Sequence, residues 1–118
     1  MENHVHEDCI MGDVCQKKKQ CPMARVQEVL AGKRKILILW YLNYKILRFG
    51  ELKRKLPDVT QKMLTQQLRA LENDGLIIRN VYACVPPRVE YSLTDLGRAF
   101  IPLLTQMQEL GKKLIINK

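Results

Sequence analysis

The stretch Phe49–Leu76 most constrains what this chain can fold into, because its residues predict two helices separated by a very short break. The first helix, expected over Phe49–Leu56, must end there because Pro57 has no amide hydrogen and cannot continue a helix. The hydroxyl of Thr60 can accept a backbone N–H and cap a second helix. That helix is expected to end at Gly75, since glycine adopts the left-handed C-cap geometry most easily. The pattern predicts a helix-turn-helix.

The expected second helix has two different faces. At about 100° per residue, Leu64, Leu68 and Leu71 fall on one apolar stripe. The opposite face is polar and cationic, and it carries Lys62, Thr65, Gln66, Arg69 and Asn73. Side chains of these types can contact phosphates or base edges when such a helix enters a DNA major groove. An ordinary solvated helix face explains the same pattern, so the helix alone does not decide between the two interpretations.

The positive charge of the chain is concentrated around this helix pair. Between Lys33 and Arg69 there are ten bases and only two acids, Glu51 and Asp58, and this window carries the whole formal net charge of +8. Such a patch favours a polyanion as partner, through phosphate contacts and counterion release. A membrane surface is the less suitable partner, because it usually binds a basic amphipathic helix with large exposed apolar residues. The apolar stripes here are better explained as core.

Length and hydropathy limit the class of protein. A chain of 118 residues suits one domain. Its longest apolar run, Ile36–Leu42, has seven residues. A helix needs about 20 apolar residues to cross a bilayer. No apolar segment typical of a secretory signal follows the N-terminus. We therefore expect a cytoplasmic protein with no membrane partner.

The N-terminal 20 residues are polar and aperiodic, and we expect them to form a flexible arm before a domain over residues 21–118. By residue type, zinc could be bound by His4, His6, Cys9, Cys15 and Cys21. Their spacing contains no CxxC or HxxxH pair that would preorganise a tetrahedral site. No metal and no other cofactor are predicted.

Two helices are expected before the helix-turn-helix. Pro22 suits the first position of a helix, and Met23–Leu30 has apolar residues at helical spacing, with Gly32 closing the helix. The next helix, Lys33–Asn43, is apolar on most sides. It is therefore expected in the core or shared with a partner subunit. Ile46–Phe49 can form a short extended piece.

After Gly75 the pattern changes from helical to extended. Leu76–Tyr82 and Val89–Thr94 are rich in β-branched and aromatic residues, as strands are. The two prolines between them prevent a helix and indicate a loop. A β-hairpin directly after a recognition helix is typical of a wing. Its Arg79 and Arg88 are expected near DNA, Arg88 especially because of its place at the loop, although a hairpin that only caps the core fits as well.

The C-terminal segment predicts one long helix from Asp95 towards Ile116, capped by Thr94. Apolar residues recur along it at heptad spacing, namely at Leu96, Phe100, Leu103, Met107, Leu110 and Leu114. Packing on its own domain would bury this seam, but the helix is long for a domain of this size. We expect a homodimer built largely from this helix, with a contribution from the first helix of the chain.

Together these elements predict a mainly α fold with a small β-hairpin wing, a winged helix-turn-helix that dimerises through its terminal helices. A dimer would present two recognition helices to half-sites about 34–36 Å apart, or a multiple of that distance. The side chains expected to contact double-stranded DNA are Thr60, Gln61, Lys62, Thr65, Gln66, Arg69, Arg79 and Arg88. Lys62, Gln66 and Arg69 are the main candidates for reading bases, since lysine and arginine favour guanine and glutamine favours adenine.

Several motifs resemble the HxlR family of bacterial regulators: CP at 21–22, GK at 32–33, LILW at 37–40, RFGEL at 48–52, LP at 56–57, TQKMLTQQLRALENDGLI at 60–77 and VPPRVEYSLTDLG at 85–97. The resemblance spans roughly residues 21–114. It implies a bacterial dimeric transcriptional regulator, often a repressor, with the winged fold predicted above. A dimer of this kind is expected to bind an inverted repeat. The chain departs from the family pattern at Ala31, in place of a glycine, and at Arg34, where the family commonly has tryptophan.

The resemblance also implies a candidate sensor, because parts of the family sense oxidants, electrophiles or aldehydes through the cysteine of the Cys-Pro pair. That cysteine matches Cys21. Its place before a helix N-terminus would stabilise a thiolate, and Cys9 or Cys15 could then form a disulfide with it. A buried Cys21 that acts only as a small hydrophobe is the alternative. Cys84, in the wing loop, has no evident activating group.

Other functions remain open at this point. A thiol enzyme using Cys21 with His4 or His6 as base would need an orienting carboxylate and an oxyanion site, and the sequence indicates neither, so no enzyme is predicted. A regulator that is constitutive or controlled by a small molecule, without a cysteine switch, fits the same motifs. A winged domain that binds only proteins would not require the cationic window.

Overall fold

The computed structural model describes residues 21–116 and divides the chain into two compact units, Met1–Ala31 and Gly32–Lys118. The described part of the first unit is α2, Pro22–Leu30, which has Cys21 as N-cap and a proline in its first turn. The helix predicted to begin at the Cys-Pro pair is confirmed. The predicted arm, with its candidate zinc ligands, lies outside the described residues, and a domain boundary at residue 21 stays a prediction.

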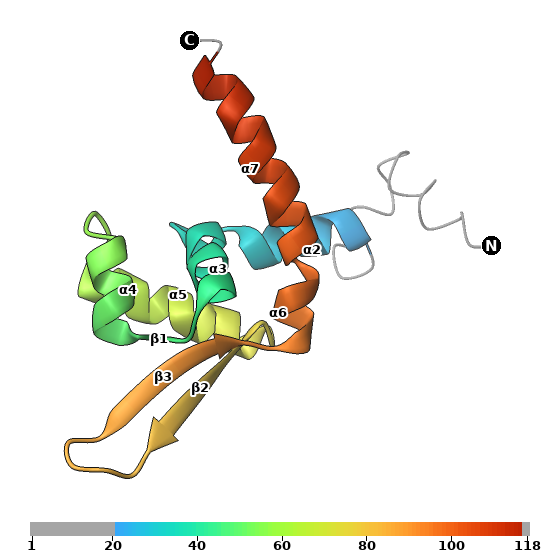
Figure 1. Ribbon diagram of the computed structural model, residues 1–118. Coiled ribbons are helices and arrows are strands. Elements are labelled where there is room, and N and C mark those ends of the chain that lie inside the picture. The colour runs from blue at the N-terminus through green and yellow to red at the C-terminus, as the bar shows by residue number, and fades with distance from the viewer. Residues whose placement is uncertain (1–20, 117–118) are drawn as a thin grey trace. The chain divides into compact units, whose positions relative to one another are not determined.

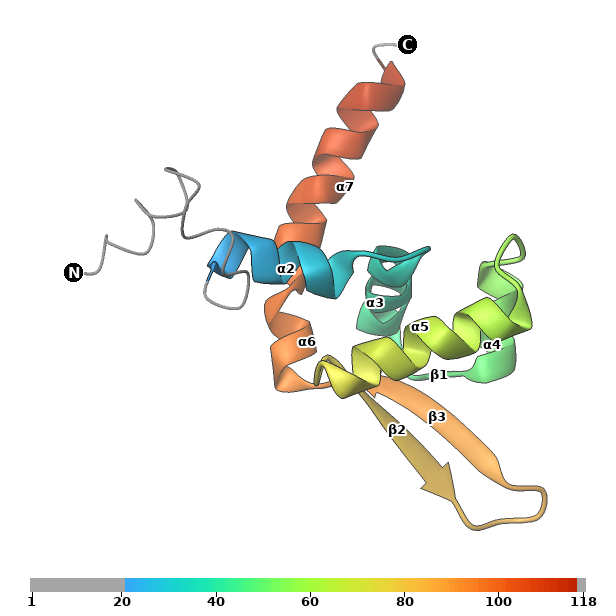
Figure 2. The same ribbon diagram turned by 180° about the vertical axis from the view of Figure 1, so that it is seen from behind.

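The second unit contains the winged helix-turn-helix (Figure 1). In chain order its elements are α3 (Lys35–Tyr44), β1 (Leu47–Arg48), α4 (Phe49–Lys55), α5 (Gln61–Asn73), β2 (Ile77–Tyr82), β3 (Arg88–Leu93), α6 (Asp95–Ala99) and α7 (Ile101–Ile116). The β2–β3 hairpin projects away from α4 and α5 in both views (Figures 1 and 2). The predicted fold class, mainly α with a small β wing, is confirmed.

The helix-turn-helix has the caps that its sequence predicts. The Thr60 hydroxyl accepts a hydrogen bond from the backbone N–H of Met63 at 3.1 Å. This bond satisfies one of the first backbone N–H groups of α5, which have no acceptor within the helix. Gly75 has φ +79°, the left-handed geometry expected at the end of that helix. The two helices are therefore fixed by local signals at the turn and at the C-terminus of α5.

The apolar stripe of α5 is the centre of the unit's core. Leu64, Leu68 and Leu71 are all buried, as predicted. They share the core with Ile38 and Leu39 of α3, both fully buried. Because α3 is apolar on most sides, it can pack against both α5 and the sheet, and the prediction of a core helix is confirmed for this part of the chain.

The sheet has three strands, whereas the sequence predicted a two-stranded wing. Its order is β1-β3-β2, and all pairings are antiparallel. Leu47 of β1 lies opposite Tyr91 of β3, and both side chains are buried. β1 has only two residues, too few to show the alternation that marks a strand. Pairing with β1 satisfies backbone N–H and C=O groups on the edge of β3 that would otherwise be unpaired.

The C-terminal segment is two helices, so the prediction of one continuous helix is wrong. Thr94 caps α6 as expected, accepting the N–H of Gly97 at 3.0 Å, but α6 ends at Ala99 and α7 begins at Ile101. Pro102 explains the break, because it has no amide hydrogen and its ring clashes with the carbonyl four residues earlier, that of Arg98. Proline is tolerated in the first turn of the new helix.

The predicted seam is not buried by its own unit. Five of the six seam side chains, Leu96, Leu103, Met107, Leu110 and Leu114, are exposed, between 38% and 72%, and the sixth, Phe100, is half-buried. The side chain that α7 buries is Leu104, and this helix packs on α3. Packing on the same domain therefore does not account for the seam. Among the described helices none is both long and apolar enough to cross a membrane.

Candidate nucleic-acid interface

The outer face of α5 presents the side chains that the sequence assigns to DNA reading. Lys62, Gln66 and Arg69 are exposed, and they lie opposite the buried leucines. Thr65 is partly buried, and its hydroxyl donates to the Gln61 carbonyl oxygen at 2.9 Å. Because Thr60 also uses its hydroxyl in the helix cap, the long cationic and amide side chains are the ones best placed to reach base edges.

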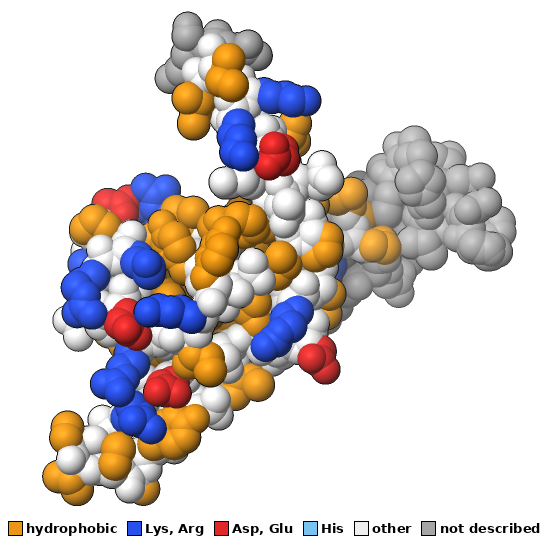
Figure 3. Space-filling view, viewed as in Figure 1, with side chains coloured by type: hydrophobic (Ala, Val, Ile, Leu, Met, Phe, Trp, Pro, Cys, Tyr) orange, Lys and Arg blue, Asp and Glu red, His pale blue; other side chains and the backbone are white. Residues whose placement is uncertain are grey.

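Cationic side chains gather beside this helix as well. Figure 3 shows Lys and Arg over α4 and the adjoining part of the wing, with a few acids among them. The last turn of α4 contains Lys53, Arg54 and Lys55, where positive charge also complements the helix dipole. The ammonium of Lys55 lies 5.4 Å from the ring centroid of Tyr41, which fixes the direction of that side chain. The charge clustering predicted from the sequence is thus retained on the folded surface.

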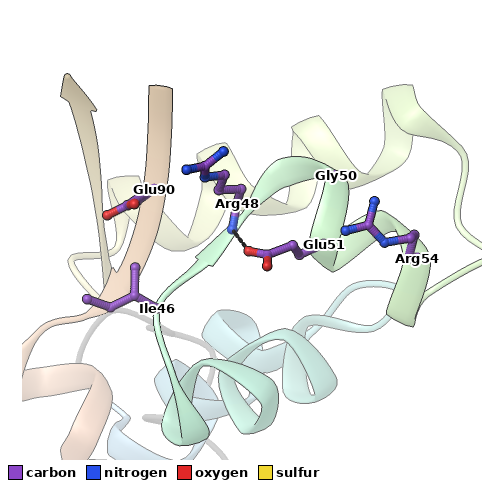
Figure 4. A pocket seen from close by; sticks show the side chains of 6 residues that line it. All are labelled: Ile46, Arg48, Gly50, Glu51, Arg54 and Glu90. Carbon is purple, nitrogen blue, oxygen red and sulfur yellow. Dashed lines mark hydrogen bonds between the residues drawn. The ribbon is translucent and has the colours of Figure 1, made fainter. Parts of the chain in front are cut away.

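One hollow of about 480 Å³ opens between β1, α4 and β3 (Figure 4). It is lined by Ile46, Arg48, Gly50, Glu51, Arg54 and Glu90. Arg48 and Arg54 lie on either side of Glu51, whose Oε1 accepts the Arg48 backbone N–H at 2.8 Å. That hydrogen bond, assisted by the positive charges of Lys45, Arg48 and Arg54, lowers the pKa of Glu51. The hollow offers guanidinium groups to an anion but no nucleophile with a base.

The Glu51 carboxylate gives a pH-dependent prediction. Because its pKa is lower in the folded protein than in the unfolded chain, its stabilisation is present above about pH 4.3, the ordinary value for Glu, and is lost as pH falls through the folded pKa. Glu51→Gln should therefore lower the free energy of unfolding more at about pH 7 than at about pH 3. Urea titrations at both pH values test this. An equal effect at both would show that the charge is irrelevant.

A second hollow, of about 300 Å³, lies between α5 and the sheet. Its lining brings together Thr65 and Arg69 of α5 and Arg79 of β2, three residues predicted at the interface. The fold thus makes one continuous surface of the recognition helix and the first wing strand. Tyr91 and Leu68 form its apolar floor.

Arg88 is placed differently from the sequence expectation. It is the first residue of β3 and not part of the exposed loop. Its Nε lies 3.3 Å from Glu90 Oε2, and its guanidinium carbon is 4.8 Å from the Tyr82 ring centroid. These contacts hold the side chain against the wing. The wing tip itself is apolar, with Val81 and Val85 exposed.

The structure also shows an ion pair that no sequence pattern indicates. The guanidinium of Arg34, at the start of α3, contacts the carboxylate of Asp58 in the turn between α4 and α5. The hydrogen bond from Arg34 lowers the pKa of Asp58, and the same bond raises the pKa of Arg34. The two residues are 24 positions apart, so no local pattern indicates the pair.

The two described cysteines differ in their surroundings. Cys21 occupies the N-cap position of α2, as expected from the Cys-Pro pair, and its 3% exposure agrees with the alternative that it is a small buried hydrophobe. Cys84 is exposed in the wing loop, and its thiol donates to the Pro86 carbonyl oxygen at 3.2 Å. Cys9 and Cys15 lie outside the described residues. Within 21–116 no three side chains of metal-binding type cluster together.

Comparison with known proteins decides the family. The model of the HxlR-like helix-turn-helix family matches residues 29–118, which include every element of the winged unit. The chain belongs to this HxlR-like family. A Bacillus subtilis (strain 168) protein described as the uncharacterized HTH-type transcriptional regulator YybR is 43% identical over 100 residues, 85% of this chain and 80% of the relative. YtcD of the same organism is 48% identical over 96 residues, 81% and 76% of the two chains.

Solved structures of similar proteins share the fold. The HTH-type regulator YtcD superposes with a TM-score of 0.77 at 46% identity, covering 82% of this chain and 98% of that one. The redox regulator HypR in its oxidized form gives a TM-score of 0.75 at 45% identity, covering 79% and 96%. The chain is thus an HxlR-type transcriptional regulator that binds DNA, and its relatives are regulators, not enzymes.

Proposed function

We propose that this HxlR-type regulator binds an inverted-repeat operator as a homodimer in the cytoplasm and represses transcription there. The observation that carries the proposal is the exposed face of α5, with Lys62, Gln66 and Arg69 pointing away from the core. All excess positive charge of the chain lies in the window that contains this helix. A helix that carries basic side chains together with an amide side chain can bind phosphates and also discriminate between the bases of DNA.

The proposed interface extends from α5 to the wing. It consists of Thr60, Gln61, Lys62, Thr65, Gln66, Arg69, Arg79 and Arg88. Arg69 and Arg79 share one hollow, so a phosphate near one is within reach of the other. Arg88 makes the weakest contribution in this scheme, because Glu90 already neutralises part of its charge.

Selection of bound duplexes from a random DNA pool tests this proposal. We expect an inverted repeat whose half-site centres lie about 34–36 Å apart, or a multiple of that distance. Enrichment of a single half-site would contradict the dimer. Recovery of unrelated sequences would contradict specific recognition altogether.

The exposed seam supports the dimer and gives a prediction. Leu103 and Leu110 are 43% and 58% exposed in the isolated chain, so a partner copy is needed to bury them. Leu103→Asp combined with Leu110→Asp should convert the protein to a monomer in sedimentation experiments and weaken operator binding. Thr105→Asp with Gln108→Asp, on other faces of α7, is the matched control and should stay dimeric. If both double variants were dimers, or both were monomers, the seam would not be the dimer interface.

We further propose that oxidation or electrophile modification of Cys21 controls operator binding. The helix N-terminus that begins at Cys21 would stabilise a thiolate there. Peroxide would oxidise the thiolate to a sulfenic acid, with one peroxide oxygen transferred to sulfur and the other released as water. A second cysteine thiol can then attack the sulfenic sulfur, which forms a disulfide and releases the sulfenic oxygen as water. The name of the relative HypR, a redox regulator with oxidized and reduced structures, is consistent with such a switch.

This proposal predicts the behaviour of two cysteine variants. A quinone or peroxide should change the operator affinity of the parent protein, and Cys21→Ala should remove the change. Cys84→Ala is the control, because it removes the exposed thiol and should leave the response intact. Operator titrations before and after treatment measure the effect. If Cys21→Ala responds like the parent, the regulator has no switch at this cysteine, and control by a bound small molecule or constitutive binding becomes the better account.

A further inference from the structure

We propose that Arg34 acts as a positioning residue for DNA binding. Its guanidinium neutralises the carboxylate of Asp58 at the turn of the helix-turn-helix and so masks this negative charge from DNA. The inference rests on the proposed DNA-binding surface and adds a residue outside it.

The geometry of the pair is specific. Both Nε and Nη2 of Arg34 contact one carboxylate oxygen, Oδ2 of Asp58, with the Nε distance 3.1 Å. The backbone of Arg34 is left-handed, with φ 71°, a conformation that few residues other than glycine adopt. This unusual N-cap of α3 aims the guanidinium at the turn. The segment around it is also closely packed, since a Cβ on Gly32 would lie 2.3 Å from Gln67 Oε1 of α5.

The location of Asp58 makes its charge important. It precedes the N-cap Thr60 by two residues, so its carboxylate lies beside the end of α5 that carries Gln61 and Lys62. DNA bound by these residues would bring phosphates within about one Debye length, 8–10 Å, of that carboxylate. An unpaired negative charge at this place repels the phosphates.

The pairing of acids in the cationic window supports this assignment. The window Lys33–Arg69 has two acids, Glu51 and Asp58. Glu51 is hydrogen-bonded to the Arg48 backbone N–H, next to two guanidinium groups. Asp58 is paired with Arg34. Both acids in the window are thereby compensated by local partners, and the cationic surface that remains is the one available to DNA.

Charge masking differs measurably from a direct phosphate contact by Arg34. The test uses the single variant Arg34→Gln and two double variants, each of which has the same net charge as the parent protein. The first double variant combines Arg34→Gln with Asp58→Asn, so that the acid left without its partner is removed as well. The second double variant combines Arg34→Gln with Glu109→Gln, which removes an acid on α7 instead. Glu109 lies on an exposed face, where it pairs with Lys112 at 3.3 Å. Operator affinity of all four proteins is measured by titration, with thermal unfolding to verify that each is folded.

We expect Arg34→Gln to bind the operator about threefold more weakly, the scale of an exposed charge effect. The loss should shrink as salt rises, because screening weakens the repulsion. The Asp58→Asn double variant should recover the affinity of the parent, and the Glu109→Gln double variant should stay as weak as Arg34→Gln.

Three results would overturn the inference. Affinity of Arg34→Gln equal to that of the parent would show that Asp58 needs no masking. If neither double variant recovered the operator affinity of the parent, Arg34 would contact a phosphate directly. If both recovered it, the effect would depend only on the net charge of the protein. A parent protein with no operator preference would instead refute the proposed DNA surface itself, so the two failures are distinguishable.

Discussion

Replacement of both Lys62 and Arg69 by alanine is expected to abolish the preference of this regulator for its operator. Each side chain that reads a base contributes about 1–3 kcal/mol of discrimination, so the double variant should lose about 2–6 kcal/mol. The fold should survive, because both side chains are exposed on the face of α5 opposite the buried leucines. Titrations with operator and scrambled duplexes measure the loss.

The control for this prediction is Lys112→Ala with Lys113→Ala on α7. It removes the same charge from exposed positions outside the proposed DNA surface. If the control loses as much discrimination as the α5 variant, net charge and not base recognition determines the preference. If neither loses any, α5 is not the recognition helix.

Leu68→Ala is expected to lower the free energy of unfolding by about 2–5 kcal/mol, the range for a leucine truncated in a packed core. Leu68 is 2% exposed and lies in the middle of the apolar stripe of α5, so the cavity would form directly beneath the recognition face. A loss of this size is a large part of the stability of a small domain. DNA binding should weaken with it.

Urea unfolding at constant protein concentration measures this loss. Glu72→Ala is the matched control, on the same helix but exposed. Alanine favours helix at least as well as glutamate, so this control should change stability little. An effect of Leu68→Ala no larger than that of Glu72→Ala would contradict the observed core.

The helix-turn-helix could be predicted from sequence because its signals are local. Pro57 ends one helix, Thr60 caps the next, and Gly75 adopts a positive φ at the end of α5. Each signal acts within a few residues. The same holds for the leucine stripe, whose helical period predicts burial without knowledge of what it packs against.

The missed features depend on contacts between distant residues or on competing local preferences. Arg34 reaches Asp58 across 24 positions, and β1 exists only because β3 lies beside it. The heptad spacing continues through Pro102 and so predicts one helix, although the helix breaks just before this proline. Arg88 follows a loop in sequence, but its place in β3 and its contact with Glu90 depend on the folded hairpin.

The most direct test of the account is titration of the selected operator and a scrambled duplex of equal length at several salt concentrations. For a surface that makes 6–10 phosphate contacts, operator affinity should fall about 10³–10⁵-fold between 50 and 200 mM salt. The operator should be preferred to the scrambled duplex throughout. Equal affinity for both duplexes at every salt concentration would contradict sequence-specific recognition by α5.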